Sequence, residues 1–247
     1  MKVIGIIPAR YKSSRFPGKP LALILNKPMI IWVCEIVEKA LGKENTYVAT
    51  DDDRIEEVVT QYGYKVVMTS ENCLTGTDRL WEVAQQIEAD IYVNIQGDEP
   101  MLDSAEILKI IEVKKQYPDF IVNGMTKLLD NEDPANINLP KVLVNNKNEL
   151  IYMSRLPIPG IKSKGTPNYY KQVCIYAFSY DELKAFGTCY EKAVYEKFED
   201  IEILRFFDLD KRIKMVETKA SSLAVDIPED IYSVEAALIE KYERNNA

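Results

Sequence analysis

Four basic side chains lie close together near the start of the chain, in a loop that follows its first apolar run. The loop at residues 8–20 also contains serine, glycine and proline, and its cations are Arg10, Lys12, Arg15 and Lys19. A triphosphate carries about four negative charges, which several cations on one loop can neutralise. The segment is not a Walker A loop, because Lys19 is followed by proline and the upstream glycine is missing. Composition alone also fits a solvated basic loop, but the position after the first strand favours a phosphate site.

Two carboxylates occupy similar places further along the chain, each directly after an apolar run. Asp98 follows Ile91–Ile95 in the segment QGDEP, and Asp226 precedes a helix opened by Pro228. Either acid alone is typical of a helix cap or a turn. Two carboxylates that each end a strand of one sheet can instead share Mg²⁺ with a substrate phosphate. The acidic run Asp51–Asp53 is a further candidate metal motif, although it fits a cap and its neighbours equally well.

A third polar segment leads from a glycine-containing loop into an amphipathic stretch. It reads GTDR and ends at Arg79. Backbone N–H groups at a helix N-terminus can hold an anion or the polar edge of a nucleobase. The alternative is that Thr77 or Asp78 simply caps this helix.

Composition excludes several classes of chemistry. The 247 residues contain no histidine and carry a net charge of −8. Histidine acid–base catalysis, a Ser–His–Asp triad and His-ligated zinc are therefore excluded, whereas phosphoryl chemistry on Mg²⁺, carboxylates, Lys and Arg remains available. The negative charge argues against nucleic acid as a partner. No apolar run is long enough for a membrane span, and four widely spaced cysteines predict reduced thiols in a cytoplasmic protein.

The elements that must position these residues alternate regularly in the first half of the chain. Hydrophobic periodicity predicts strands at Lys2–Ile7, Tyr47–Thr50, Lys65–Met68 and Ile91–Ile95. It predicts helices at Met29–Leu41, Asp53–Tyr62 and Ala105–Lys115, and a further helix that is capped by Thr77 or Asp78 and runs to about Ile87. This order predicts an α/β fold with a largely parallel sheet flanked by helices. Ligands of such sheets bind at the carboxyl ends of the strands, where the basic loop and Asp98 both lie.

From about residue 120 the pattern changes. Strands are predicted at Phe120–Met125, Lys141–Val144, Leu150–Met153 and Tyr170–Phe178, followed by helices at Asp181–Phe186, Ala193–Phe206 and Pro228–Tyr242. We therefore expect a single domain, 1–247, with a core of about 1–119 and 181–247 and an inserted mixed-sheet region of about 120–180.

The motifs taken together resemble one known family. The segments IPARYKSSRFPGKPL, VATDDDRI, GTDR, VNIQGDEP, YMSRLPIP, IYAF, IEILR and VDIPEDI occur in the order found in the 3-deoxy-manno-octulosonate cytidylyltransferases, the CMP-Kdo synthetases. This resemblance implies a GT-A-like nucleotide-binding domain that forms homodimers through its inserted strands. It also implies CTP and an acidic sugar as substrates, Mg²⁺ as the cofactor and a role in lipopolysaccharide biosynthesis.

The resemblance also assigns roles to individual residues. The nucleotide would be held by Pro8, Ala9, Arg10, Arg15, Lys19, Thr77 and Arg79. The catalytic residues would be Arg10, Lys19, Asp98 and Asp226, the two aspartates being the metal ligands. The acceptor sugar would be held by Gln96, Arg155, Gln172, Tyr176 and Glu202. A hydroxyl of the sugar would attack the α-phosphate of CTP in line, and pyrophosphate would leave.

The chain departs from the family pattern where the sugar is expected. A family histidine is Gln172 here, a Glu-Gln pair is Glu202-Ile203, and the histidine before GTDR is absent. Loss of a hydrogen-bonding glutamine would leave a sugar hydroxyl unpaired. The alternatives are an acceptor with another acidic or amino-substituted structure, or a non-catalytic CTP-binding homologue. A sugar-transferring enzyme that uses Asp51–Asp53 is disfavoured, because the basic loop suits a triphosphate better than a diphosphate-sugar.

Overall fold

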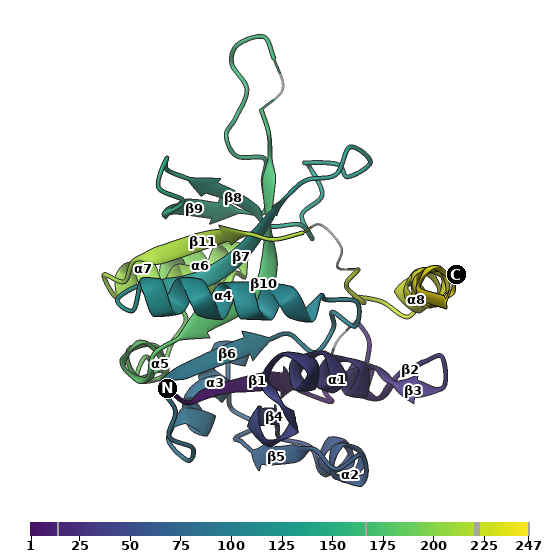
Figure 1. Cartoon of the computed structure of the whole chain (residues 1–247). Helices are drawn as coiled ribbons and strands as arrows, with labels where there is room; N and C mark the ends of the chain where they lie inside the picture. The colour runs from purple at the N-terminus through teal and green to yellow at the C-terminus, as the bar shows by residue number, and fades with distance from the viewer. Residues whose placement is uncertain (14, 166, 220–222, 247) are drawn as a thin grey trace.

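The protein is described by a computed structural model at residues 1–13, 15–165, 167–219 and 223–246 (Figure 1). Within these residues a nine-stranded sheet has a main path in the order β11-β7-β10-β6-β1-β4-β5. The bounds of these strands are Ile213–Glu217, Ile121–Lys127, Tyr170–Phe178, Ile91–Ile95, Val3–Ala9, Thr46–Thr50 and Lys65–Met68, respectively. A separate two-stranded sheet is formed by β2 (Leu23–Ile24) and β3 (Lys27–Pro28).

Helices cover both faces of the sheet, because apolar side chains line both faces of β1. Ile4 and Ile6 belong to one hydrophobic core, and Ile7 belongs to the other. The first core is completed by α3 (Gly76–Ala84) and α5 (Tyr180–Gly187), the second by α1 (Met29–Leu41), α2 (Asp53–Gln61) and α4 (Ser104–Gln116). A methyl group at Gly5 would lie 2.4 Å from Cγ1 of Val37, so this glycine allows α1 to pack close to β1.

The strand pairing confirms the predicted fold class. β1 pairs in parallel with β4 and β6, and β4 pairs in parallel with β5. β10 runs antiparallel between β6 and β7, while β11 pairs in parallel with β7. The result is a largely parallel sheet with an antiparallel strand near its centre.

The region predicted as an insertion divides between the main sheet and a branch. Both β7 and β10 lie inside the main sheet, where β10 pairs with β6 and β7 pairs with β10. Only β8 (Lys141–Val144) and β9 (Leu150–Ser154) leave that path, as an antiparallel hairpin joined to the start of β10. Figure 1 shows this hairpin and the following loop extending away from the layers of sheet and helix.

One predicted helix is wrong in its extent. The stretch Ala193–Phe206 is divided into α6 (Val194–Glu199), the 3-10 turn η3 (Glu202–Leu204) and α7 (Arg205–Asp208). Asp200 has a left-handed backbone with φ 49°, which ends α6. After this break, Ile201 and Ile203 point into the hydrophobic core. Their burial stabilises the interrupted helix relative to a continuous one.

Smaller differences occur near the end of the chain. The strand β11 was not expected, because its five residues, IKMVE, show little alternation, yet pairing with β7 makes it an edge of the sheet. The helix predicted from Pro228 begins at Asp230, as α8 (Asp230–Asn246). Cys34, Cys73, Cys174 and Cys189 are free thiols, as expected. The described part of the chain contains no helix with the length and apolar character needed to cross a bilayer.

Candidate active site

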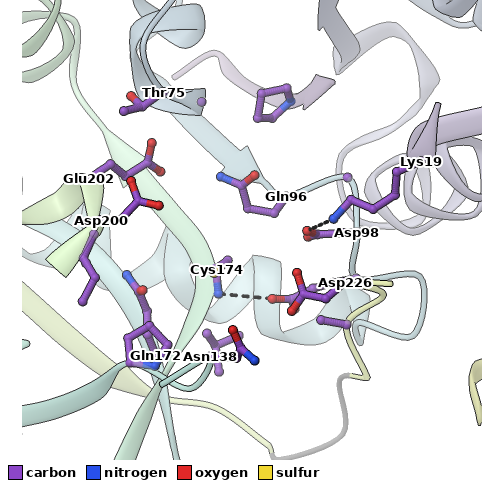
Figure 2. A pocket seen from close by; sticks show the side chains of 18 of the residues that line it. Lys19, Thr75, Gln96, Asp98, Asn138, Gln172, Cys174, Asp200, Glu202 and Asp226 are labelled. Carbon is purple, nitrogen blue, oxygen red and sulfur yellow. Dashed lines mark hydrogen bonds and ion pairs between the residues drawn. The ribbon is translucent and has the colours of Figure 1, made fainter. Parts of the chain in front are cut away.

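A cleft of about 940 Å³ opens at the carboxyl ends of β1 and β6. Its walls come from the basic loop, the start of α3, the loop before β8, the strand β10, the turn before η3 and the segment before α8. Figure 2 shows Lys19, Asp98 and Asp226 on one side, Asp200 and Glu202 on the other, and Gln96 between them. We call the first side the nucleotide half and the second the acceptor half, after the roles that the sequence predicts.

The basic loop presents Lys19 to the nucleotide half. The loop closes where the Gly18 N–H donates to the Tyr11 carbonyl at 2.9 Å. Gly18 has φ +71°, and a side chain there would contact the Tyr11 ring at 3.1 Å, so glycine is needed for this turn. Lys19 Nζ then donates to Asp98 Oδ2 at 2.7 Å and to the Val225 carbonyl at 2.9 Å.

The two predicted metal ligands lie next to each other, although 128 residues separate them in sequence. The Val225 N–H donates to the Asp98 carbonyl at 2.9 Å, which joins the segment before α8 to the end of β6. Asp226 Oδ1 lies 3.1 Å from Arg15 Nη2. Each predicted metal ligand is thus paired with a cation of the basic loop, and together they form two ion pairs at the cleft.

The remaining nucleotide residues divide into two groups. Pro8 and Ala9 end β1 and line the cleft, as does Arg10, an exposed side chain with no ion-pair partner among the described residues. Arg79 also lines the cleft, with Nη2 3.4 Å from Asp51 Oδ1. Thr77 does not line it, because this residue is 1% exposed, and its N–H donates to Glu202 Oε2.

The helix cap at α3 differs from the simple alternative considered for the sequence. Thr75, rather than Thr77 or Asp78, is the N-cap, and its Oγ1 accepts from the Asp78 N–H at 3.3 Å. Asp78 instead forms an ion pair with Arg205 at 2.7 Å. In the acidic run Asp51–Asp53, Asp52 caps α2, and none of the three acids lines the cleft. The structure therefore gives no support to a metal motif at this run.

On the acceptor half, Gln172 occupies the place of the family histidine. Its Nε2 donates to the Tyr176 hydroxyl at 3.0 Å and to Asn123 Oδ1 at 3.1 Å. Asn123 in turn donates to the Val173 and Ile175 carbonyls at 2.9 Å, across the irregular step of β10. Burial raises the pKa of the Tyr176 phenol well above its usual value, so this hydroxyl stays protonated. The Gln172 side chain thus lines the cleft and is fixed there by its hydrogen bonds to the buried Asn123 and Tyr176.

Glu202 lies deep in the acceptor half. Its Oε2 accepts from the Thr77 N–H at 3.0 Å, whereas its buried Oε1 has no hydrogen-bond partner within the part of the chain that is described. Burial raises the pKa of this carboxyl above its ordinary value. The next residue, Ile203, is 1% exposed and packs in the core, so it does not form part of the cleft wall. The expected loss of a polar contact through Ile203 therefore finds no support.

Arg155 lines the same half, but its guanidinium is occupied by main-chain carbonyls. Nη1 donates to Ile137 at 2.7 Å and Nη2 to Asp200 at 2.9 Å, and Nε donates to Glu199. Gln96 lines the cleft at the end of β6, between the two halves.

Several lining residues were not predicted from the sequence. They include Glu132, Asn138, Lys171, Cys174, Lys192, Asp200 and Lys219. Cys174 could have been found, because it alternates with Gln172 and Tyr176 along a predicted strand. The loop and turn residues carried no such signal, since only the tertiary fold brings them to the cleft.

The groups present fit a Mg²⁺ ion that is shared with a substrate. Two carboxylates, Asp98 and Asp226, lie on adjoining segments, and no group of three or more His, Cys, Asp or Glu residues that could hold a metal exists among the described residues. Mg²⁺ is commonly bound by one or two carboxylates together with phosphate and water, so this donor set suits it better than a cage made of protein ligands alone.

The known proteins that this chain resembles in sequence are cytidylyltransferases. The family model described as cytidylyltransferase matches residues 4–213. The chain is 36% identical to the 3-deoxy-manno-octulosonate cytidylyltransferase of Escherichia coli, over 99% of each chain. It is 38% identical to the 8-amino-3,8-dideoxy-manno-octulosonate cytidylyltransferase of Shewanella baltica, covering 96% of this chain and 99% of that one.

A solved structure agrees with these relatives. The structure of CMP:2-keto-3-deoxy-manno-octonic acid synthetase complexed with CTP superposes with a TM-score of 0.91 at 36% identity, covering 98% of this chain and 100% of the other. The cleft at the carboxyl ends of β1 and β6 is where such a sheet is expected to bind its ligand. The chain belongs to the cytidylyltransferase family and is a nucleotidyltransferase related to the CMP-Kdo synthetases.

Proposed function

We propose that the protein transfers the cytidylyl group of CTP to a hydroxyl of Kdo or a Kdo-like acidic sugar. The new bond joins the sugar oxygen to the α-phosphorus, the bond from the α-phosphorus to the bridging oxygen breaks, and pyrophosphate leaves. The observation that carries this proposal is the nucleotide half, where two cations of one loop meet two carboxylates from distant segments at 2.7 and 3.1 Å. The cleft-facing Arg10 adds a further cation.

The residues of the chain act by binding and orienting. Arg10, Arg15 and Lys19 supply positive charge for the triphosphate, and Lys19 is placed to neutralise charge on the departing pyrophosphate. Asp98 and Asp226 would hold Mg²⁺, which when bound neutralises phosphate charge and favours ionisation of the attacking hydroxyl. Gln96 and Gln172 offer amides to hydroxyls of the acceptor. No histidine is required by this arrangement.

The direct test is to incubate the protein with CTP, Mg²⁺ and Kdo and to measure pyrophosphate and the CMP-sugar. We expect stoichiometric formation of both products, and none when CTP or Kdo is omitted. Binding of CTP without pyrophosphate release across a panel of acidic sugars would instead support a non-catalytic CTP-binding homologue.

A second candidate acceptor carries an amino group. Glu202 places a buried carboxylate oxygen without a described partner in the acceptor half, and an ammonium group would satisfy both its charge and its hydrogen bond. The Shewanella relatives are named for an 8-amino sugar acid. Kinetics with Kdo and with its 8-amino analogue decide between the two. A higher kcat/KM for the amino sugar, lost in Glu202→Gln, would favour the second acceptor.

We also propose that two copies associate through the branch of the sheet. Ile151 and Leu156, from β9 and the residues after it, are 52% and 66% exposed, and Val194 and Phe198 of α6 are 59% and 85% exposed. β9 and α6 adjoin, since the Tyr152 and Tyr195 rings meet edge to face at 5.9 Å. Large exposed apolar side chains on adjoining elements are typical of a subunit interface. Light scattering should give a dimer for the wild type and a monomer for Phe198→Asp.

The cytoplasmic location, predicted from the cysteines and the lack of a long apolar run, and the role in lipopolysaccharide biosynthesis, implied by the family resemblance, stay predictions. They would be checked by fractionation of the native cells and by the effect of gene deletion on the lipopolysaccharide.

A further inference from the structure

We propose that Arg155 is a positioning residue that fixes the distance between the two loops of the acceptor half, rather than a ligand of the acceptor itself. This inference rests on the proposed function only for the identity of the acceptor. The guanidinium of Arg155 joins two segments of the cleft wall that are far apart in sequence.

The contacts of the guanidinium carry the inference. Three of its nitrogens donate to three main-chain carbonyls, which belong to Ile137 on one segment and to Glu199 and Asp200 on the other. Arginine presents its donors in a rigid planar fork, so contacts at both edges fix the positions of the groups that accept them. Lysine has a single flexible ammonium group and cannot reproduce this arrangement.

The break in the helix after α6 explains why these carbonyls need a donor. The last carbonyls of a helix have no N–H partner within the helix, and the left-handed Asp200 ends α6 one residue after Glu199. Arg155 supplies the missing donors to both carbonyls. The Glu199 side chain reciprocates, because it accepts from the Arg155 N–H at 2.8 Å and from Ser154 Oγ at 2.7 Å. The end of β9 and this turn therefore hold each other.

The other segment is anchored in a similar way. Ile137 lies in the loop before β8, where Nζ of the fully buried Lys141 donates to the Asn136 carbonyl at 2.7 Å. Asn138 of this loop lines the cleft, as do Asp200 and Glu202 of the opposite turn. The separation of these polar groups is thus set by the guanidinium that joins the two segments.

This arrangement predicts a selective effect. Removing the guanidinium frees the loop and the turn, so the acceptor groups lose their spacing and the acceptor binds more weakly. CTP binding should be preserved, because Lys19 and Asp98 lie on other elements and are paired with each other. A residue that merely stabilised the fold would affect both substrates.

The experiment compares the full-length wild type with Arg155→Ala, Arg155→Lys and the control Arg212→Ala. Arg212 is an exposed arginine whose side chain pairs with Glu149 at 2.8 Å, away from the cleft. Hydrogen exchange is measured by mass spectrometry without substrates, together with CTP affinity by calorimetry and steady-state kinetics with Kdo.

In Arg155→Ala we expect amide exchange at 136–139 and 199–203 to be about tenfold faster, the acceptor KM to rise about tenfold or more, and CTP affinity to stay within about twofold. Arg155→Lys should show a smaller rise in exchange at both segments, and Arg212→Ala should match the wild type. If Arg155 instead binds the acceptor directly, Arg155→Ala will raise the KM while exchange at both segments stays unchanged, which overturns the proposal.

The exchange measurement separates this proposal from the proposed function. If the wild type shows no turnover with CTP and any acidic sugar, the function fails, while faster exchange at both segments still supports the positioning role. If Arg155→Ala does not fold, the same comparison is made with Arg155→Lys, whose unchanged exchange at both segments would overturn the proposal.

Discussion

The two halves of the cleft use their charged side chains in different ways. In the nucleotide half, charged side chains face one another, as Lys19 and Asp98 do at 2.7 Å, and they are carried by segments next to the core strands β1 and β6. In the acceptor half, Arg155 is bonded to main-chain carbonyls, and the cleft is lined largely by loops and turns. Charge pairing therefore organises the nucleotide half, whereas hydrogen bonds to the main chain of loops and turns organise the acceptor half.

The largest expected effect comes from breaking the charge pairing of the nucleotide half. Lys19→Met or Asp98→Asn should lower kcat by about 10³-fold, because each removes a preorganised charge from the reacting phosphates. Turnover is measured by pyrophosphate release at saturating CTP. Lys12→Met is the matched control, since Lys12 is exposed and pairs with Glu71 outside the cleft. Near-normal turnover in Asp98→Asn would remove this residue from the catalytic set.

The next effect concerns the stability of the acceptor half. Arg205 is 1% exposed and lies 2.7 Å from both Glu196 and Asp78, so it joins α6, α7 and α3 beneath the turn that carries Glu202. Arg205→Met leaves the buried Glu196 and the largely buried Asp78 without their cation and should lower the free energy of unfolding by about 3–5 kcal/mol, measured in urea.

The double variant Arg205→Met with Glu196→Gln provides the check on this interpretation. Removing the charge of Glu196, which has lost its cation, should restore part of the free energy of unfolding. A double variant that is less stable than Arg205→Met would show that packing of the arginine stem, including its contact with the Phe186 ring at 3.7 Å, determines stability instead.

A smaller effect should appear in the binding of the two charged ligands. In the free protein, Lys19 pairs with Asp98, and Arg15 pairs with Asp226. Mg²⁺ alone would take the carboxylates and leave the cations without partners, and CTP alone would do the reverse. We expect each to increase the affinity for the other by about tenfold, a coupling of about 1.4 kcal/mol, measured by calorimetry. In Arg15→Met, which frees Asp226, Mg²⁺ alone should bind more tightly than to the wild type. Independent binding in the wild type would contradict this exchange of partners.

The smallest expected effect is a change in the pH dependence of stability at Glu202. Burial raises the pKa of this carboxyl in the folded state, so the folded protein binds more protons than the unfolded chain between the unfolded and folded pKa values. The stability that protonated Glu202 contributes is therefore lost as the pH rises from the unfolded pKa value through the folded one. Glu202→Gln should remove this dependence and add about 1 kcal/mol of stability at neutral pH, while weakening the acceptor.

Urea unfolding of the wild type and Glu202→Gln at a series of pH values from 4 to 8 would measure this difference. Two curves that stay parallel would show that the carboxyl has an ordinary pKa and is solvated in the folded protein.

Local patterns were sufficient for most of the fold. The helix Met29–Leu41 and the strands Lys65–Met68, Ile91–Ile95 and Tyr170–Phe178 have the predicted bounds, because apolar periodicity and burial agree there. The division of Ala193–Phe206 was missed because its sequence favours helix, and only the core that receives Ile203 makes the break favourable.

The candidate site shows the same division. Arg10 and Asp98 could be predicted for the nucleotide half from the sequence, because they follow β1 and β6 closely and the carboxyl ends of parallel strands meet at one edge. In the acceptor half, the burial of Ile203 and the contacts of Arg155 with carbonyls of two loops depend on the tertiary fold. Those contacts join residues distant in the chain, and a local pattern carries no information about which distant carbonyl a side chain will meet.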